Sequence, residues 1–346
     1  MIVASGEDPR LSRYHRQMLF APFGVDGQSK LADARVGLVG CGALGSVIAS
    51  HLVRAGVGHL RVVDRDFLEL NNLQRQMLYT EADVRERIPK AEAAARHLRE
   101  FNSEVTVEPV VADINPFSIL SFAEGLDLLV DGTDNFTTRF LVNDYCVSRG
   151  IPWVYGGVIM AGGMTMTFVP GEGHCLRCVF PEMPAPGSSP TCDTVGVLNT
   201  VVAVVGSLEA NEVFKLILDP EVRNKGLLTV DVWNLAFETV EVSRDPECPA
   251  CAHGLFPFLQ GAHEESAVSL CGRDAVQIVP AAGPGLDLES LRSRLEAVGP
   301  VRLNPFLLEL EVEGKTMTVF PDGRAIIKGT DDVAVARVLY ARYVGQ

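Results

Sequence analysis

Hydrophobic and polar positions in the first half of the chain alternate between two patterns. Short apolar runs, typical of strands buried on both faces of a parallel sheet, precede stretches in which apolar residues recur at helical spacing. The runs expected as strands are 36–39, 60–63, 105–111, 126–130 and 151–155, and the stretches expected as helices are 44–52, 90–101, 116–124 and 136–149. This alternation predicts an α/β fold with a parallel sheet between layers of helices.

The pattern changes after the last of these runs. Met164 and Met166 alternate with threonines, which is typical of a half-exposed antiparallel strand over 162–169. An apolar stretch at 195–218 predicts a long helix, and residues 226–232 predict a further strand. We therefore expect a Rossmann-like mixed sheet that is mainly parallel, with helices on both faces.

The two ends of the chain depart from the alternation. Residues 10–31 combine apolar and basic side chains as an amphipathic helix does, which gives a helical arm before the sheet. The elements expected near the other end are a strand at 268–279, a helix at 288–298, a meander of strands from 308 and a last helix at 332–343. Because 346 residues exceed one typical core, we expect a domain at 1–252 that includes the arm, a linker at 253–266 and a small α+β domain at 267–346.

Three glycines mark the first turn of the expected sheet. Gly40, Gly42 and Gly45 follow the first apolar run at G-x-G-x-x-G spacing, and Asp64 ends the second run. Such glycines let the backbone approach a phosphate at a helix N-terminus, and an acid in this position can bind ribose hydroxyls. The pattern predicts a nucleotide-binding site, and taken alone it favours an NAD-dependent oxidoreductase.

Amide, cationic and acidic side chains follow the next strand ends. Asn72 and Arg75 lie in a polar loop that leaves the carboxyl end of a parallel strand, where open α/β sheets bind ligands. Lys90 opens the next expected helix. Asp131 and Asp134 follow a buried run, and an acid at that edge suits Mg²⁺ bound to nucleotide phosphates.

Two C-x-x-C pairs stand far apart in the sequence, Cys175 with Cys178 and Cys248 with Cys251. Four thiolates in two such pairs form a closed tetrahedral site that is typical of structural zinc. A redox pair or unrelated buried thiols are the alternatives. We expect a zinc site formed by these four cysteines within the first domain.

A further thiol, Cys192, lies near the end of a stretch rich in Pro, Gly and Ser, at the approach to the apolar helix. A thiol close to a helix N-terminus has a lowered pKa and can act as a nucleophile, and a packing role is the alternative. We interpret Cys41 and Cys146 as packing residues and Cys271 as a strand residue.

Composition limits the partners of the chain. The formal net charge of −14 argues against a nucleic-acid partner, because a phosphate backbone would be repelled. The N-terminal residues lack the pattern of a signal peptide, and the longest apolar stretch is too short to span a bilayer. We expect a cytoplasmic protein without a membrane partner, whose eight cysteines are reduced.

The motifs follow one another in the order of a known family. They are R-Y-H-R-Q at 13–17, G-C-G-A-L-G, N-L-Q-R-Q at 72–76, P-K at 89–90, D-G-T-D-N, both C-x-x-C pairs and T-C-x-x-x-G-V at 191–197. Over roughly residues 10–252 the chain resembles the ThiF/MoeB/HesA family, whose members are similar to the adenylation domains of ubiquitin-activating enzymes. The tail resembles an extension found on ThiF proteins of thiamine synthesis in some bacteria.

This resemblance implies ATP-dependent adenylation of the C-terminal Gly-Gly carboxylate of a small β-grasp sulfur carrier, with release of pyrophosphate. The residues that match the family's nucleotide site are Asp64 for the ribose, Asn72, Arg75 and Lys90 for the phosphates, and Asp134 for Mg²⁺. Arg16 would reach into the partner's nucleotide site in a homodimer. Positive side chains and a metal ion would offset the charge that develops when a carboxylate attacks the α-phosphate.

Several alternatives stay open at this point. The carrier can be ThiS-like, for thiamine thiazole biosynthesis, or MoaD-like, for molybdopterin; the tail favours the first. Cys192 is a candidate acceptor of the activated carrier, and the missing rhodanese-like extension implies a separate sulfur donor such as a cysteine desulfurase. An NAD-dependent oxidoreductase and a non-catalytic β-grasp-binding scaffold are the competing functions, and neither explains Arg75, Lys90 and Asp134 together.

Overall fold

A computed structural model describes residues 9–184, 192–261, 267–270, 274–279 and 286–345. The chain divides into two compact units, Met1–Ala262 and His263–Gln346. The first unit continues beyond the second C-x-x-C pair. There the buried Phe258 packs against Phe140, with ring centroids 4.9 Å apart, and its amide donates to Asp144.

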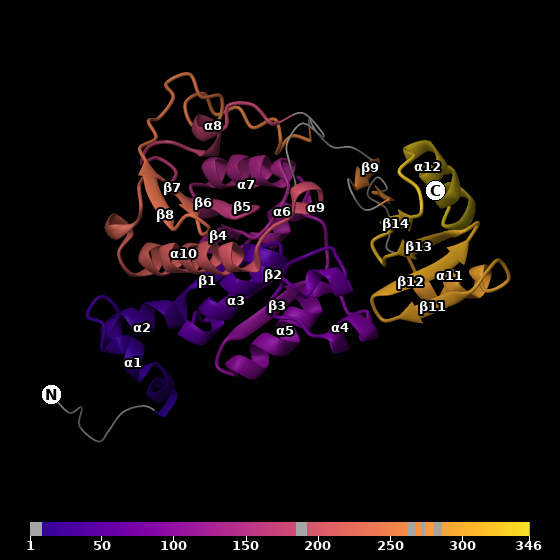
Figure 1. Cartoon of the computed structure of the whole chain (residues 1–346), viewed down its shortest axis with the longest axis horizontal. Helices are drawn as coiled ribbons and strands as arrows, with labels where there is room; N and C mark the ends of the chain where they lie inside the picture. Colours follow the sequence, from indigo (N-terminus) through magenta and orange to yellow (C-terminus); the bar gives the residue numbers. More distant parts are fainter. Residues whose placement is uncertain (1–8, 185–191, 262–266, 271–273, 280–285, 346) are drawn as a thin grey trace. The chain divides into compact units, whose positions relative to one another are not determined.

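The first unit contains an eight-stranded sheet in the order β3-β2-β1-β4-β5-β6-β7-β8 (Figure 1). Its strands are β1 (Arg35–Val39), β2 (His59–Val63), β3 (Thr106–Val110), β4 (Leu128–Asp131), β5 (Trp153–Ile159), β6 (Gly162–Phe168), β7 (Leu227–Asp231) and β8 (Ala236–Val240). The first five strands are parallel, and β6 to β8 join antiparallel. This mixed, mainly parallel sheet agrees with the sequence pattern. The strand order reverses between β1 and β4, and ligands of open α/β sheets bind at such a reversal.

Helices cover both faces of this sheet (Figure 1). The helices are α3 (Ala43–Ala55), α4 (Glu81–Glu86), α5 (Lys90–Phe101), α6 (Ser118–Phe122), α7 (Phe136–Arg149), α8 (Leu176–Val179), α9 (Cys192–Val195) and α10 (Asn199–Leu218), with 3₁₀ turns at Leu70–Asn72 and Pro220–Val222. Side chains from α3, α5 and α10 form one core with the sheet, and those from α6 and α7 form a second core on the opposite face. Within the described residues, no helix has the length and hydropathy that a membrane span requires.

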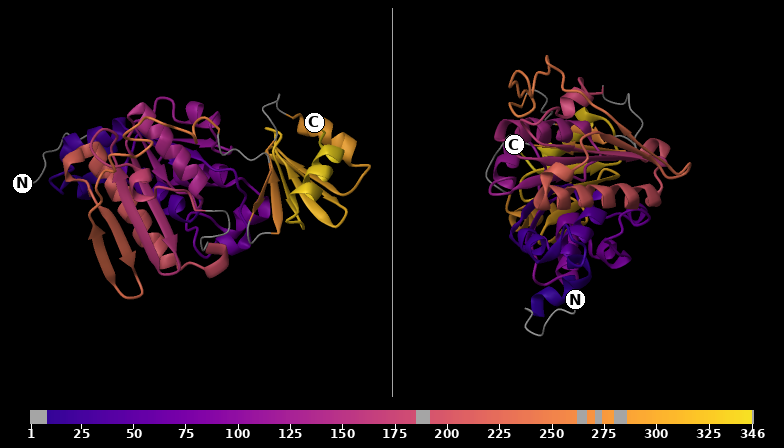
Figure 2. Two further views of the ribbon diagram at one scale, coloured as in Figure 1. Left: turned by 90° about the horizontal axis from the view of Figure 1, so that it is seen from above. Right: turned by 90° about the vertical axis from the view of Figure 1, so that its left-hand side faces the viewer.

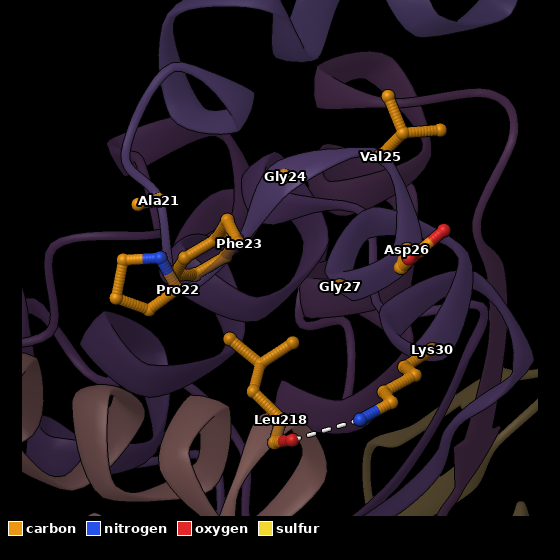
Figure 3. Close-up of a pocket in the computed structure, with 9 residues that line it drawn as sticks. All are labelled: Ala21, Pro22, Phe23, Gly24, Val25, Asp26, Gly27, Lys30 and Leu218. Atoms are coloured by element: carbon orange, nitrogen blue, oxygen red, sulfur yellow. Dashed lines mark hydrogen bonds between the residues drawn. The ribbon is translucent and has the colours of Figure 1, made fainter.

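The N-terminal arm consists of three short helices, where the sequence pattern predicted one. They are η1 (Pro9–Tyr14), α1 (His15–Met18) and α2 (Gly24–Asp33). The sequence Pro22-Phe23-Gly24 interrupts the helical path, since proline lacks an amide donor and Gly24 adopts a φ of 54°. A hollow of about 270 Å³ lies between this turn and the end of α10, where Lys30 donates to the carbonyl of Leu218 at 2.9 Å (Figure 3).

The long apolar helix begins later than its sequence pattern predicted. Instead of a helix from residue 195, the short α9 ends there and α10 begins at Asn199. Gly196, with a φ of 81°, turns the chain towards β5, and its carbonyl accepts from the Met160 amide. Because residues 196–198 form these backbone hydrogen bonds with Met160, they do not belong to the helix.

The strand β8 forms the edge of the sheet, and no strand was predicted there. All five of its residues are exposed, so the run has no hydrophobic face that would signal burial. The hairpin of β7 and β8 is drawn in orange in Figure 2.

The second unit is a six-stranded antiparallel sheet in the order β11-β12-β13-β14-β10-β9. Its elements are β9 (Ala267–Leu270), β10 (Ala275–Ile278), α11 (Leu288–Leu295), β11 (Val301–Asn304), β12 (Leu307–Val312), β13 (Lys315–Val319), β14 (Ala325–Lys328) and α12 (Val333–Tyr343). The strand predicted at 268–279 is therefore two paired strands, and β11 was not predicted. Cys271 lies outside the described residues. The α+β character agrees with the sequence pattern.

One carboxyl group is buried in the first unit without a partner. Glu209 on α10 is fully buried against β5, where a Cβ placed on Gly156 would lie 2.1 Å from its Oε1. Neither of its carboxyl oxygens has a hydrogen-bond partner in the described part of the chain. Burial, followed by the nearby Asp131, raises the pKa of Glu209 well above its ordinary value. Burial in the folded chain thus favours the neutral form of Glu209.

A raised pKa in the folded state means that the Glu209 contribution to stability falls as the pH rises above the unfolded value, because the unfolded chain loses the proton first. We expect Glu209→Gln, which is neutral at every pH, to raise the free energy of unfolding at pH 8 by about 1–3 kcal/mol and to change it little at pH 5. Urea unfolding at several pH values measures this difference. The exposed Glu238→Gln is the control, and a gain from Glu209→Gln that does not depend on pH would contradict the explanation.

Candidate functional site

The turn between β1 and α3 lies in backbone contact with the end of β4. A Cβ on Gly45 would stand 2.1 Å from the Gly40 carbonyl oxygen, and one on Gly132 would stand 2.3 Å from the same atom. Gly40 itself has a φ of 86°, which favours glycine. Among the described residues, no side chain caps the start of α3 at Gly42. Amide groups at this helix N-terminus can therefore receive a phosphate.

Asp64 links the end of β2 to this turn. Its Oδ2 accepts from the Cys41 amide and its Oδ1 from the Asp66 amide, both at 2.8 Å. Burial raises the pKa of Asp64, and the nearby Lys90 opposes this shift. The carboxylate is thereby fixed at the carboxyl edge of the sheet, and each oxygen keeps a second lone pair for a ligand hydroxyl.

Lys90 opens α5 at the same edge. Its side chain is buried, and its Nζ lies 3.1 Å from Oδ2 of Asp66. The backbone reinforces this placement, because the Lys90 amide donates to the Asp66 carbonyl at 2.9 Å. Tyr79 donates its hydroxyl to the carbonyls of Cys41 and Lys90 and so connects the glycine turn to α5. The structure thus brings Lys90, Asp64 and the glycine turn together.

Asn72 and Arg75 lie in the loop between β2 and α4. Asn72 is buried, and its Oδ1 accepts from the Glu69 amide at 3.0 Å. Arg75 is half-buried, and its Nη1 donates to the Asn71 carbonyl at 3.1 Å. The loop passes beside the glycine turn, since a Cβ on Gly42 would stand 3.8 Å from the Gln76 amide nitrogen.

One buried aspartate ends β4, and one exposed aspartate lies in the loop that follows. Asp131 was expected at the ligand edge, but it is buried and accepts from Arg139 at 2.8 Å and from the Thr133 hydroxyl at 2.6 Å. Asp131 is thus occupied by structural contacts. Asp134 is exposed at the end of the loop, close enough to contribute to the raised pKa values of Arg65 and Arg139.

Two arginines of this region were not singled out from the sequence. Arg139 donates to Asp131, to the Thr133 carbonyl and to the Gly156 carbonyl, so it joins the loop to β5. Arg65 forms an ion pair with Asp113 at 3.1 Å. Arg65 could have been identified from the sequence, because it lies just after the end of β2. The sequence around Arg139 indicates nothing beyond a position on an expected helix.

Arg16 lies on α1 and is exposed. Its side chain forms no hydrogen bond or ion pair with any described residue. The structure of one chain does not bring it to the other predicted nucleotide-site residues.

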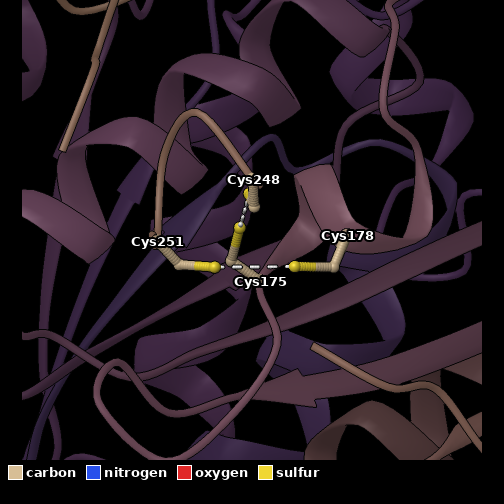
Figure 4. Close-up of side chains that lie close together, drawn as sticks. All are labelled: Cys175, Cys178, Cys248 and Cys251. Atoms are coloured by element: carbon tan, nitrogen blue, oxygen red, sulfur yellow. Dashed lines mark hydrogen bonds between the residues drawn. The ribbon is translucent and has the colours of Figure 1, made fainter. Parts of the chain in front are cut away.

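The four cysteines of the two C-x-x-C pairs converge in the first unit. The sulfur atoms of Cys175, Cys178, Cys248 and Cys251 all lie within 4.8 Å of one another (Figure 4). The hydrogen bond from Cys175 lowers the pKa of the Cys178 thiol. Four sulfurs at this separation fit the corners of a tetrahedral metal site.

Cys192 begins α9 and is half-buried. Its thiol donates to the Val158 carbonyl at 3.4 Å, which fixes it near the carboxyl end of β5. Cys192 was expected at the approach to the long helix, which begins at Asn199; between them lies α9, which has only four residues. A helix dipole of the long helix therefore gives Cys192 no direct support.

The ThiF family model matches residues 14–250. The sulfur carrier protein ThiS adenylyltransferase of Bacillus subtilis (strain 168) is 41% identical over 336 residues, which cover 96% of this chain and 99% of that protein. A sulfur carrier protein adenylyltransferase of Thermus thermophilus is 42% identical over 247 residues, which cover 70% of this chain and 90% of that protein. The crystal structure of E. coli MccB with ATP aligns with a TM-score of 0.61 at 25% identity, over 71% of this chain and 75% of that one. This chain belongs to the ThiF family.

Proposed function

We propose that this chain uses ATP to adenylate the C-terminal carboxylate of a small sulfur carrier protein and releases pyrophosphate. The observation that carries the proposal is the gathering of an uncapped helix N-terminus, Asp64 and the buried Lys90 at one sheet edge. The names of the Bacillus subtilis and Thermus thermophilus relatives support the reaction. Family membership removes the main argument for an oxidoreductase, which rested on the glycine motif alone.

We assign a separate role in nucleotide binding to each residue at this edge. Asp64 binds the ribose, while the turn amides, Asn72, Arg75 and Lys90 neutralise the phosphates. Asp134, exposed in the loop after β4, would bind Mg²⁺, which would offset charge on the phosphates during attack by the carboxylate. Catalysis of this kind consists mainly of positioning and charge neutralisation.

The preferred partner is a ThiS-like carrier, a β-grasp protein ending in Gly-Gly, in thiamine thiazole biosynthesis. The similarity to the Bacillus subtilis ThiS adenylyltransferase extends through the second unit, whereas other relatives match about 70% of this chain. A MoaD-like carrier of molybdopterin synthesis is the second candidate, since relatives named MOCS3 match about 70% of this chain. We further propose a homodimer in which the exposed Arg16 serves the partner's site, a cytoplasmic location and a separate cysteine desulfurase as sulfur donor.

Exchange of labelled pyrophosphate into ATP tests the reaction. With a Gly-Gly carrier and Mg²⁺ present, we expect exchange by the wild-type chain and a loss of about 100-fold for Asp134→Asn, because a neutral amide binds Mg²⁺ weakly. Asp127→Asn is the control, since Asp127 lies at the opposite end of β4, where it accepts from the Arg35 amide. A chain that binds the carrier without any exchange would be the non-catalytic scaffold.

We propose that the four-cysteine cluster binds one structural Zn²⁺. Cys248→Ser is expected to remove the metal and lower the melting temperature by about 5 °C or more, because a closed zinc site contributes folding energy. Metal analysis and thermal unfolding measure both effects. Cys146→Ala, which changes a buried thiol outside the cluster, is expected to retain the metal. Full metal content in Cys248→Ser would contradict the assignment.

Cys192 is proposed as the nucleophile that accepts the activated carrier. Cys192→Ser is expected to keep pyrophosphate exchange within about twofold and to lower sulfur transfer to the carrier at least about tenfold, since a hydroxyl is a much weaker nucleophile. Mass spectrometry of the carrier follows the transfer, with Cys146→Ser as the thiol control. Undiminished transfer would assign Cys192 a packing role.

A further inference from the structure

We infer that Arg65, held in place by Asp113, recognises the base of the bound nucleotide and sets the preference for adenine. This inference rests on the proposed function, because it assumes that ATP binds at the carboxyl edge of the sheet. The two residues follow the ends of neighbouring strands: Val63 of β2 is in register with Val110 of β3. The loops that carry Arg65 and Asp113 therefore leave the sheet side by side.

The ion pair fixes the plane of the arginine. Nη1 of Arg65 lies 3.1 Å from both carboxylate oxygens of Asp113, and Nε lies 3.8 Å from Asp66. Nη2 has no hydrogen-bond partner among the described residues. The side chain keeps 30% of its surface exposed, so a ligand can reach part of it. An arginine held in this way is prepared to contact a ligand, because its rotamer freedom is already restricted.

The order of the strands favours the base as the part of the nucleotide that Arg65 contacts, although Asp134 after β4 also lies close enough to act on its guanidinium. The glycine turn follows β1, Asp64 follows β2, and Asp113 comes after β3. A nucleotide whose phosphates meet the glycine turn and whose ribose meets Asp64 must extend its base towards β3. Lys90 forms an ion pair with Asp66 at the same edge, and Asp64 accepts from the Cys41 amide on the phosphate side.

The surroundings of the pair suit a purine. A hollow of about 270 Å³ runs along β2, β3 and α6 and is lined by Arg61, Val63, Glu108, Val110, Ala112, Ile114, Ser118, Ser121 and Phe122. Part of this lining is an apolar surface formed by Val63, Val110, Ala112 and Ile114, which lie close in the sequence to Arg65 and Asp113. An aromatic base can pack one face against such a surface and present the other to a guanidinium, which is attracted by the ring electrons. The free Nη2 donor can in addition meet the ring nitrogen acceptors of adenine, whereas guanine presents a different arrangement of donors and acceptors.

Titration calorimetry with the full-length chain tests the inference, using ATP, GTP and inorganic tripolyphosphate as ligands. We expect Arg65→Ala to weaken ATP binding about tenfold, to reduce the ATP-over-GTP preference and to leave tripolyphosphate binding unchanged. Arg65→Lys should recover only part of the ATP affinity, because an ammonium group lacks the planar face. Asp113→Asn, which loosens the arginine, should weaken ATP in the same direction and by less.

The controls separate this inference from the proposed function. Lys90→Ala is expected to weaken tripolyphosphate and ATP together, and the exposed Arg96→Ala is expected to change neither. An equal loss of tripolyphosphate and ATP binding in Arg65→Ala would identify a phosphate contact and overturn the inference. Unchanged ATP affinity in that variant would also overturn it while leaving the proposed function intact. A wild-type chain that binds neither ATP nor tripolyphosphate would overturn both.

Discussion

The close approach of two backbone segments determines the geometry of the candidate site. The Gly40 carbonyl lies where a side chain on Gly45 or Gly132 would have to stand, so the β1–α3 turn, the first turn of α3 and the end of β4 pack without side chains between them. Hydrogen bonds from Gly40 to β2 and from Gly132 to β1 hold the three strand ends at one level. The ligand edge is therefore defined mainly by main-chain atoms, and those leave room for a phosphate.

Charge at this edge is distributed as matched pairs in an acidic protein. Arg139 pairs with Asp131 beneath the acidic loop, and Arg65 pairs with Asp113 at the ends of β2 and β3. The Arg139 pair is buried and also ties the loop to β5, so it sets where the exposed Asp134 emerges. The exposed Asp134 belongs to one of the family's sequence motifs. The buried pair of Arg139 and Asp131 holds the loop on which Asp134 lies.

Much of the fold follows from local sequence. The helix α7 has the predicted bounds, because Asn135 caps its start and Gly150 adopts the left-handed conformation at its end, and both signals are readable in the sequence. The start of α10 was mispredicted because the apolar pattern continues through Gly196, while the pairing of that segment with Met160 is a tertiary contact. Strand β8 was not predicted, because all of its residues are exposed and no hydrophobic face marks it in the sequence.

The candidate site was predicted in part, for the same reason. Gly40, Asp64 and Lys90 belong to motifs whose strand or helix context is local, and the structure gathers them at one edge. Asp131 was expected at that edge, yet its role depends on Arg139, a contact across two elements that spacing alone does not reveal. The convergence of the four cysteines was foreseeable only because their paired spacing is chemically distinctive.

The pairing of Lys90 with Asp66 has a consequence for which anions the protein accepts. A buried ammonium group without a counter-charge would be costly, and Asp66 supplies that counter-charge while the site awaits its ligand. An incoming anion must compete with a resident carboxylate, so chloride or a single phosphate gains little by entering. A polyanion that also binds the helix amides can displace Asp66 from Lys90. The Asp66 carboxylate therefore makes binding of small anions less favourable than binding of a polyphosphate.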